Sequence, residues 1–515
     1  MLNIKNLTHG FEDRTLYKNV SIKINKGNKI GLVGANGTGK TTLINILAGK
    51  IICDEGSIEW EKNYNIGYLD QHIEIDTNLT IRKYLESAFL ELKKLEAEYN
   101  AINAKFATAG DSEFEELARR SASLFEYLDS RNYYAIDSTI NKVALGLGVT
   151  PLGMETKIGK LSGGQRAKVI LCKLLLENPD ILILDEPTNH LDTAHIEWLK
   201  EYLKSFDGSF LIVSHDTVFL DAVCNTIWSV ENKSIVRYNG NYTDFLRQQA
   251  EKNLVLERTI KKQEQKIEKL EDFIARNSAR TATAKQAQSR AKQLEKMEII
   301  ERGEQVIEPK YKFLYMPLSA HTVLKAENLS IGYNFPLISG INWEIHNGEK
   351  WRITGFNGIG KTTLLKTLLG EIGAIKGKVT KHHLLKIGYF EQEIAWGMPH
   401  LTPIEEMRNE FPKLEDKQLR SSLAKAGLST KHQMQPLCRL SGGEQSKVKL
   451  AKFMLEQYNL VVLDEPTNHL DPLCKKALAK AINEYRGTLI FVSHEEDFAQ
   501  SIDYKTLDLS KLKNN

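Results

Sequence analysis

Two glycine-rich segments of the chain have the residue types needed to hold a chain of phosphates. They read Gly34-Ala-Asn-Gly-Thr-Gly-Lys40-Thr41 and Gly355-Phe-Asn-Gly-Ile-Gly-Lys361-Thr362, and both fit the P-loop pattern GxxxxGK[ST]. In such a loop the glycines let backbone N–H groups turn toward the phosphates, the lysine reaches the outer phosphates, and the threonine hydroxyl ligates Mg²⁺. Glycine-rich turns between a strand and a helix also occur for steric reasons alone, so each segment needs support from other residues.

An acidic pair follows each P-loop at the end of an apolar run. The runs are Ile-Leu-Ile-Leu-Asp185-Glu186 and Leu-Val-Val-Leu-Asp464-Glu465. The first carboxylate of each pair suits the Mg²⁺ shell, and the second can orient or deprotonate the water that attacks the outer phosphate. Two acids at a strand end are also common without such a role, so the pair alone leaves both interpretations open.

The P-loops and acidic pairs belong to an internal repeat. Three pairs of equivalent residues are each 279 positions apart, whereas the two P-loop lysines are 321 apart; the pairs are Ser162 with Ser441, Asp185 with Asp464, and His215 with His494. The first copy therefore carries 42 additional residues, which lie between Gln71 and Ser162. Leu, Ala, Glu and Lys at helical spacing over about residues 85–134 predict that this insertion is a helical arm.

The segment between the two copies has a helical pattern of its own. Its apolar stripe follows a 4-3 spacing typical of a coiled-coil seam once Gln263 is included, and consists of Leu256, Ile260, Ile267, Leu270 and Ile274. A second stripe follows, so we expect two antiparallel helices with a turn near residues 277–283. The predicted organisation is α/β: a first P-loop domain at residues 1–240, a helical hairpin linker at 241–322, and a second P-loop domain at 323–515.

Composition narrows the class of protein. The 515 residues are 42% hydrophobic and 26% charged, which is the balance of a globular protein with more than one domain. The formal net charge of +3 is too small to indicate a partner. The five cysteines form no CxxC pair, which argues against a disulfide framework or a zinc site. The chain opens on a strand-like run, so we expect neither a leader sequence nor a membrane span.

Taken together, the ordered motifs resemble ATP-binding cassette domains. Each copy has a P-loop, a glutamine 31 residues beyond the lysine, Leu-Ser-Gly-Gly, the acidic strand and Ser-His. The tandem arrangement is similar to that of the ABC-F family, and the resemblance extends over essentially the whole chain. It includes Asp185-Glu-Pro-Thr-Asn-His-Leu-Asp192, repeated from Asp464 to Asp471, and the linker sequence at residues 284–296.

The resemblance implies two ATP sites between cassettes packed head to tail. Each site would combine one P-loop with the signature of the other cassette, so that Lys40 faces Ser441, Gly442 and Gly443, and Lys361 faces Ser162, Gly163 and Gly164. The other residues expected to bind ATP are Gly34, Asn36, Gly37, Gly39, Thr41 and Thr42, their counterparts Gly355, Asn357, Gly358, Gly360, Thr362 and Thr363, and the adenine-stacking Phe11 and Tyr333.

The family also implies catalytic and metal-binding roles. Hydrolysis would depend on the bases Glu186 and Glu465, the switch histidines His215 and His494, and the loop glutamines Gln71 and Gln392. Mg²⁺ would be held by Thr41, Gln71 and Asp185 in one site and by Thr362, Gln392 and Asp464 in the other. A lone histidine after an apolar strand is more often a structural cap, so the family pattern alone supports the histidine roles.

The linker indicates a target for the ATP switch. Residues 273–294 contain no Asp or Glu, and their basic residues are Arg276, Arg280, Lys285, Arg290 and Lys292. A stiff, basic hairpin can enter a phosphate-lined cavity. ABC-F proteins bind the ribosome near the tRNA exit site, so the resemblance implies a cytoplasmic, monomeric translation factor whose linker contacts large-subunit rRNA and the P-site tRNA. The alternative is that these charges are a solvated helix face.

Other functions remain open at this stage. Some ABC-F proteins protect ribosomes from antibiotics, but the arm insertion and the short linker turn favour a translation factor. An ATPase subunit of a membrane transporter would have no evident use for the arm or the basic linker. DNA repair of the excision type would bring cysteine pairs, which the sequence lacks.

Overall fold

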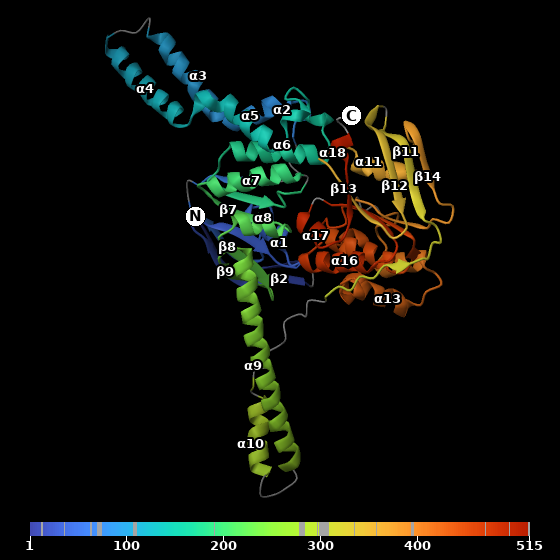
Figure 1. The fold of residues 1–515 in the computed structure, drawn as a ribbon. Coiled ribbons are helices and arrows are strands. Elements are labelled where there is room, and N and C mark those ends of the chain that lie inside the picture. Colours follow the sequence, from blue (N-terminus) through green and yellow to red (C-terminus); the bar gives the residue numbers. More distant parts are fainter. Residues whose placement is uncertain are drawn as a thin grey trace.

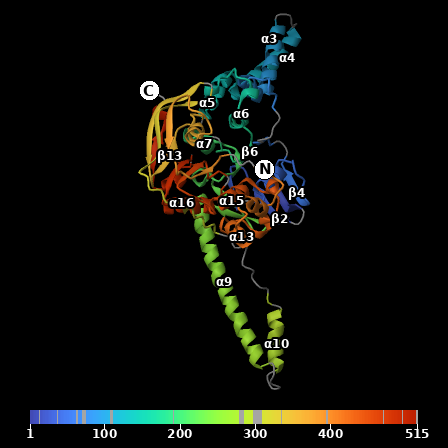
Figure 2. The same cartoon turned by 90° about the vertical axis from the view of Figure 1, so that its right-hand side faces the viewer.

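A computed structural model describes most of the chain. The described residues are 1–11, 14–35, 37–61, 64–69, 75–106, 111–189, 191–277, 284–295, 297, 308–333, 335–356, 358–392, 396–468, 470–493 and 495–512. Within these ranges, every helix is too short or too polar to cross a membrane. Figures 1 and 2 show two α/β bodies side by side, with two helical projections pointing in different directions.

The first body contains a mostly parallel sheet that carries its P-loop. Its strand order is β5-β6-β7-β3-β8-β9, and only β9 runs antiparallel to its neighbour. These strands are β3 (Lys29–Val33), β5 (Ile66–Tyr68), β6 (Ile181–Asp185), β7 (Ser209–Val213), β8 (Thr226–Glu231) and β9 (Ser234–Asn239). The central strands β6 and β7 are apolar along most of their length and buried on both faces, as expected for a parallel sheet covered on both sides.

A second, antiparallel sheet covers one face of this body. Its order is β2-β1-β4, with β1 (Leu2–Phe11), β2 (Arg14–Ile24) and β4 (Glu55–Trp60). Helix α1 (Lys40–Leu47) shares one core cluster with both sheets. Leu43 and Ile44 of α1 are fully buried there, and each contributes roughly 2 kcal/mol. This burial fixes the start of α1, where the P-loop ends.

Helices cover the opposite face and form the arm. They are α2 (Ile81–Glu86), α5 (Ile136–Gly146), α6 (Gly163–Leu176), α7 (Thr193–Ser205) and α8 (Thr217–Val223), with 3-10 turns at Ser87–Phe89, Tyr133–Ala135, Thr150–Leu152 and Ile158–Lys160. The arm consists of α3 (Leu90–Lys105) and α4 (Asp111–Ser130), which pack together and project from the body (Figure 1). Arg120 of α4 donates to Glu98 of α3 at 2.9 Å.

The second body repeats the first. Its parallel sheet has the order β15-β17-β18-β13-β19 and its antiparallel sheet the order β12-β11-β14. The strands are β11 (Thr322–Gly332), β12 (Pro336–His346), β13 (Lys350–Thr354), β14 (Lys376–Lys381), β15 (Ile387–Phe390), β17 (Leu460–Asp464), β18 (Thr488–Val492) and β19 (Lys505–Asp508). The helices are α11 (Lys361–Leu369), α12 (Pro403–Glu410), α13 (Asp416–Lys425), α14 (Thr430–Gln433), α15 (Gly442–Phe453), α16 (Pro472–Glu484), α17 (Glu496–Gln500) and α18 (Leu509–Leu512), with a 3-10 turn at Leu437–Arg439. The predicted α/β fold with two tandem P-loop domains is confirmed.

A long helical hairpin joins the two bodies. Helix α9 (Tyr242–Asn277) has 36 residues, or about 54 Å at 1.5 Å per residue, and α10 (Ala284–Glu295) packs against its far end (Figures 1 and 2). Ile260 and Leu270 of α9 are buried, whereas Leu256 is 40% exposed. The prediction that the seam starts at Leu256 is therefore wrong, because the shorter α10 does not reach that far.

The chain enters the second body earlier than the sequence pattern indicated. Tyr311 and Phe313, which the pattern assigned to the linker, are buried in the core of the second body. The short strand β10 (Leu314–Tyr315) pairs in parallel with β16 (Gln457–Tyr458), and the Lys310 N–H donates to the Lys425 carbonyl at 2.7 Å. The last part of the linker, which includes Lys310 and β10, is thus bound to the second body.

Candidate functional site

The two P-loops have the backbone geometry that binds an anion. Gly39 and Gly360 are the N-caps of α1 and α11, with φ of 98° and 114°, a left-handed conformation that strains residues with a Cβ. Lys40 Nζ turns back to the Gly34 carbonyl at 2.9 Å, and Lys361 Nζ to the Gly355 carbonyl at 2.8 Å. Each loop therefore gathers an ammonium group and a helix N-terminus in one place.

An aspartate from the other body acts to raise the pKa of each P-loop lysine. Burial lowers the pKa of Lys40, and nearby carboxylates oppose this, including Asp471 of the second body. Burial likewise lowers the pKa of Lys361, opposed by Glu465 and by Asp192 of the first body. Asp192 and Asp471 are equivalent positions of the repeat, so the electrostatic influence of each body on the P-loop lysine of the other is reciprocal, as expected for head-to-tail packing.

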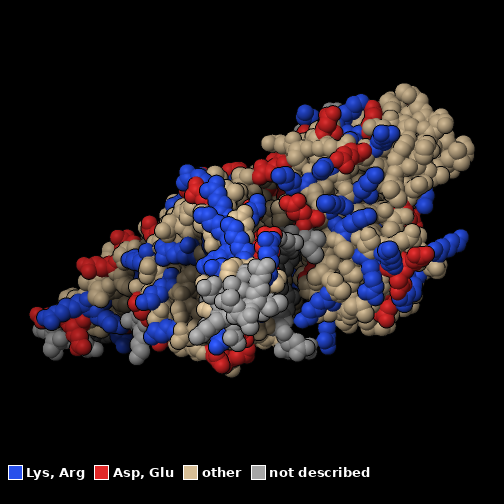
Figure 3. All heavy atoms as spheres, turned by 90° about the horizontal axis from the view of Figure 1, so that it is seen from below, with Lys and Arg blue, Asp and Glu red and all other residues tan. Residues whose placement is uncertain are grey.

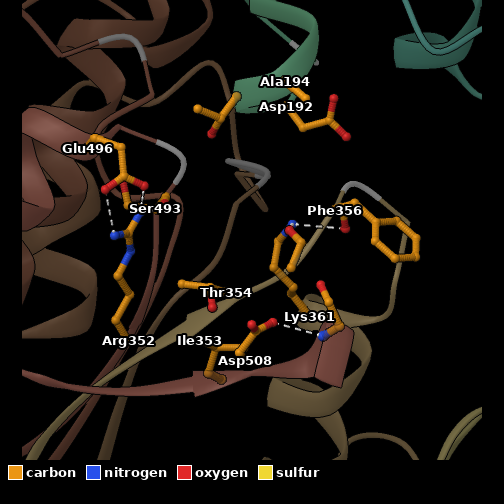
Figure 4. A pocket seen from close by; sticks show the side chains of 13 residues that line it. Asp192, Ala194, Arg352, Ile353, Thr354, Phe356, Lys361, Ser493, Glu496 and Asp508 are labelled. Atoms are coloured by element: carbon orange, nitrogen blue, oxygen red, sulfur yellow. Dashed lines mark hydrogen bonds and ion pairs between the residues drawn. The ribbon is translucent and has the colours of Figure 1, made fainter. Parts of the chain in front are cut away.

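A cavity lies between the bodies at the second P-loop. Its volume is about 330 Å³, and Asp192, Thr193 and Ala194 of the first body face Gly355, Phe356 and Lys361 of the second across it. Figure 4 shows Asp192 on one side and Lys361 with Phe356 on the other. Residues of both bodies therefore share one site, although the chain separates them by more than a hundred residues.

The acidic strands fit a magnesium ion beside each P-loop. Thr362 donates its hydroxyl to Asp464 Oδ2 at 2.8 Å, and the Thr41 hydroxyl bonds to Asp185 in the first body. Asp464 Oδ1 is buried and has no hydrogen-bond donor among the described residues. Burial also raises the pKa of Asp464 and of Asp185. A buried carboxylate oxygen beside a hydroxyl is a suitable donor set for Mg²⁺.

The glutamates that follow these aspartates are held in a strained conformation. Glu186 and Glu465 both have φ of 49°, which is unfavourable for a residue with a Cβ and is often found at functional sites. Glu186 Oε1 lies 3.5 Å from Nε2 of His215. Burial, together with the charge of Asp185, raises the pKa of Glu186 to about 8. A carboxyl that titrates near neutral pH is suited to exchange a proton with water.

The signature segments form the starts of two helices. Ser162 caps α6 and Ser441 caps α15, and each serine accepts from the third helical residue, which returns the bond in a capping box. In the second signature Glu444 also pairs with His432 at 3.0 Å. A Cβ on Gly163 would meet nothing within 4 Å. The protein's own packing does not require a glycine there, which suits close approach of a ligand to the backbone.

Several predicted residues lie elsewhere or outside the described part. Asn36, Gln71, Arg280, Asn357 and His494 are outside the described residues. Gln392 follows β15 with an exposed side chain. Phe11 and Tyr333, at the ends of β1 and β11, are 51% and 68% exposed, so each ring is accessible to an adenine.

The basic residues of the hairpin end differ in their local partners. Arg276 forms an ion pair of 2.8 Å with Asp272, one turn earlier on α9. Arg290 of α10 lies over the ring of Phe273, 4.0 Å from its centre. Lys292 is exposed. The local ion pair reduces the charge that Arg276 offers to a partner, whereas Arg290 and Lys292 keep theirs.

Sequence reasoning missed residues that contact across the two bodies. Asp192 and Asp471 were noticed only as the last residues of a repeated run, and Lys475 was not singled out. Lys475 donates to the backbone carbonyl of His215 at 3.2 Å, 260 residues away. Superposing the two copies of the repeat would have drawn attention to it, because the equivalent residue of the first copy is Ile196.

Comparisons with known proteins agree with this geometry. A family model described as ABC transporter matches residues 17–189 and 338–468, and a second model with that description matches residues 228–313. The chain is 45% identical to the ATP-binding protein YfmM of Bacillus subtilis over 98% of both chains. It is 33% identical to ABC transporter F family member 5 of Arabidopsis thaliana, over 99% of this chain and 75% of that one.

Among solved structures, the fold is similar to that of an archaeal ribosome recycling factor, aABCE1, in complex with a ribosomal stalk protein. The TM-score is 0.59 at 18% sequence identity, and the match covers 98% of this chain and 87% of the other. At that identity the likeness concerns the fold: two cassettes in one chain, arranged as a pair.

Proposed function

The chain belongs to the ABC-F family of tandem ATP-binding cassette ATPases, and from that premise we propose that its ATP-closed form binds the ribosome near the tRNA exit site. In this proposal the hairpin of α9 and α10 reaches toward large-subunit rRNA and the P-site tRNA, and ATP hydrolysis releases the protein. We therefore expect it to act in the cytoplasm, as a monomer whose two cassettes pair within one chain.

The ATP sites explain how a nucleotide can control binding. Each ATP would touch a P-loop of one cassette and the signature serine and glycines of the other, so the γ-phosphate bridges the two bodies. Glu186 and Glu465 would each accept a proton from the attacking water, while Lys40 and Lys361 hold the phosphates. Mg²⁺ at Thr41 with Asp185, and at Thr362 with Asp464, would neutralise phosphate charge. Loss of the γ-phosphate removes the bridge and lets the cassettes separate.

The observation that best supports the ribosome as the target is the hairpin, which extends beyond the cassettes and ends in a basic segment. Figure 3 looks at the molecule from the hairpin side and shows Lys and Arg side chains over much of this face, with Asp and Glu among them. Positive charge on a stiff rod favours a phosphate-rich partner through counterion release. The match of a family model to residues 228–313 supports the hairpin as a shared feature of these proteins.

Further support comes from the arm and from the structural neighbours. The arm of α3 and α4 is a second projection, and by the family resemblance an arm of this kind favours a translation factor over a drug-protection protein. The similar archaeal protein is described as a ribosome recycling factor, and a second neighbour, with TM-score 0.58 and 20% identity, is described as ribosome-bound. These descriptions concern those proteins, and they favour the same partner for this chain.

Site-directed crosslinking would test where the hairpin lies. A photo-crosslinking amino acid would replace Arg290 or Lys292, one at a time, in a Glu186→Gln, Glu465→Gln protein bound to purified ribosomes with ATP. We expect crosslinks to large-subunit rRNA and to the P-site tRNA. The matched control carries the same amino acid at Glu251, near the base of α9, and should give no crosslink to tRNA.

The outcome distinguishes the proposal from its alternatives. Crosslinks from residue 290 to tRNA that disappear with ADP would support an ATP-dependent exit-site factor. Equal labelling of all RNAs in both nucleotides would indicate non-specific electrostatic binding and would contradict the proposed position of the hairpin.

A further inference from the structure

One buried lysine contacts the switch segments of both ATP sites. Lys475, on α16 of the second cassette, is 9% exposed. Its Nζ lies 2.7 Å from Oε2 and 2.8 Å from Oε1 of Glu495, which directly follows the second switch histidine. The same Nζ donates to the backbone carbonyl of His215, the first switch histidine, at 3.2 Å. A single ammonium group thus joins His215 of the first cassette to Glu495 of the second.

The surroundings of this lysine are acidic. Burial raises the pKa of Glu495, an effect that Lys475 opposes and Asp216 of the first cassette reinforces. Burial and Asp216 also raise the pKa of Asp497, while Lys200 and Lys475 lower it. Asp216, Glu495 and Asp497 therefore meet where the two cassettes touch, and Lys475 supplies positive charge among them. Without it, Glu495 would lose its ion pair and would face the like charge of Asp216 across the interface.

The first cassette has no equivalent of this lysine. The corresponding residue of the repeat is Ile196, which packs against the apolar core of the first cassette and has no donor on its side chain. Glu495 corresponds to Asp216, whose carboxylate instead caps α8 through the Phe219 N–H at 2.8 Å. The link that Lys475 makes between the two switch segments is therefore asymmetric, although the cassettes are a repeat.

We propose that Lys475 is a positioning residue that holds the two switch segments in register, so that hydrolysis at each ATP site depends on it. The proposal rests on the roles given above to Glu186, Glu465 and the switch histidines, and it is independent of the ribosome. The two residues that Lys475 contacts, His215 and Glu495, lie outside both P-loops. It acts through the His215 carbonyl on one side and through Glu495 on the other.

The proposal predicts a change in turnover rather than in ATP binding. Lys475→Met keeps the length of the side chain but removes its charge and its donors. Loss of a charged hydrogen bond that positions a reacting group corresponds to about a tenfold loss of rate. We expect kcat to fall by about that factor, with KM for ATP changed by less than about twofold.

Variants with only one working ATP site distinguish a residue that links both sites from a residue that affects hydrolysis at one site. In Glu186→Gln only the site of Glu465 hydrolyses ATP, and in Glu465→Gln only the site of Glu186 does so. Hydrolysis would be measured in single turnovers with protein in excess, without ribosomes, so that low residual rates remain measurable. Lys475→Met should slow both backgrounds about tenfold. The matched control is Lys480→Met, an exposed position on the same helix, which should slow neither.

A second substitution tests the two contacts separately. The amide of Lys475→Gln can still donate to the His215 carbonyl but cannot neutralise Glu495. It should recover part of the rate in Glu465→Gln, where the His215 site works, and none in Glu186→Gln. This pattern also distinguishes positioning from a general loss of folding, which would lower both rates together.

Three results would be decisive against the proposal. Slowing in only one background would show that Lys475 serves a single cassette, and slowing in neither would show that it has no part in turnover. A rise in KM with unchanged kcat would show that it acts on ATP binding. If the Glu186→Gln, Glu465→Gln protein itself hydrolyses ATP at the original rate, the assignment of the bases fails, and that result is obtained before Lys475 is changed.

Discussion

The hydroxyl of Thr362 donates a 2.8 Å hydrogen bond to Asp464, although 102 residues separate them in the sequence. The bond joins the end of the P-loop to the end of the acidic strand. Parallel strands β13 and β17 bring these two ends to the same edge of the sheet, with β18 between them. Both residues are therefore positioned to bind a cation. The Oδ1 atom of Asp464 accepts no hydrogen bond from the described residues and can serve as a ligand.

Replacing both strained glutamates should abolish turnover and preserve nucleotide binding. The Glu186→Gln, Glu465→Gln protein loses the two groups that accept a proton from water, so we expect ATP hydrolysis to fall by at least about 10²-fold. ATP binding should change little, since neither side chain belongs to a P-loop. A fluorescent ATP analogue and a phosphate-release assay would measure the two quantities. Glu197→Gln, on the exposed part of α7, is the control, and unimpaired turnover in the double variant would show that the base lies elsewhere.

The pKa of Glu186 predicts a pH-dependent stability in the absence of nucleotide. Its pKa is raised from 4.5 to about 8 in the folded protein, so between these values the folded state retains a proton that the unfolded state releases. Stability should therefore fall as pH rises from about 4.5 to about 8. Relative to wild type, Glu186→Gln should gain stability on the order of 4 kcal/mol at pH 8 and little at pH 4.5.

Denaturant unfolding of both proteins at several pH values would measure this difference. Glu197→Gln again serves as the control. A stability difference between wild type and Glu186→Gln that is independent of pH would contradict the raised pKa.

Arg352 should matter for the second ATP site alone. Its guanidinium forms a bidentate pair with Glu496, at 2.7 and 3.0 Å, and donates to the Ser493 carbonyl at 3.1 Å beside the second switch histidine (Figure 4). The equivalent residue of the first cassette is Gly31, where a Cβ would come within 2.9 Å of Ile227. In the Glu186→Gln background, Arg352→Met should slow turnover about tenfold, as expected when a charged pair is removed.

The other background provides the comparison for Arg352. In Glu465→Gln, where only the first site works, Arg352→Met should leave the rate unchanged. Equal losses in both backgrounds would show that Arg352 supports the interface between the cassettes rather than the second switch segment.

The basic hairpin end should affect ribosome affinity in a salt-dependent way. Arg290→Glu with Lys292→Glu should weaken binding to purified ribosomes. It should also reduce the slope of log affinity against log salt, by about one for each phosphate that the protein no longer neutralises. Lys262→Glu with Lys266→Glu, earlier on α9, is a control with the same change of charge. An unchanged slope in the first variant would show that these residues form a solvated helix face.

The sequence predicted the features that repeat locally. Three of these features each depend on a few neighbouring residues, so they can be recognised without knowledge of the fold. They are the GxxxxGKT motif, the apolar run before Asp185 and the Ser-Gly-Gly cap of α6. The difference in spacing between the two copies similarly located the arm, because 42 extra residues had to lie in one place.

Contacts between the cassettes could not be predicted in this way. The bond from Lys475 to the His215 carbonyl spans 260 residues and uses a backbone acceptor, which leaves no trace in residue types. The burial of Tyr311 and the exposure of Leu256 depend on where α10 ends and where the chain returns to the second cassette. Both positions are determined by packing between distant parts of the chain, and a helical repeat pattern holds no information about such packing.

Co-sedimentation of the Glu186→Gln, Glu465→Gln protein with purified ribosomes tests the central proposal most directly. The protein would be pelleted through a sucrose cushion with ATP, with ADP, and without ribosomes. We predict that it pellets with ribosomes in ATP and stays in the supernatant in ADP. A folded protein that binds ATP but fails to pellet in either nucleotide would contradict the ribosome as its target.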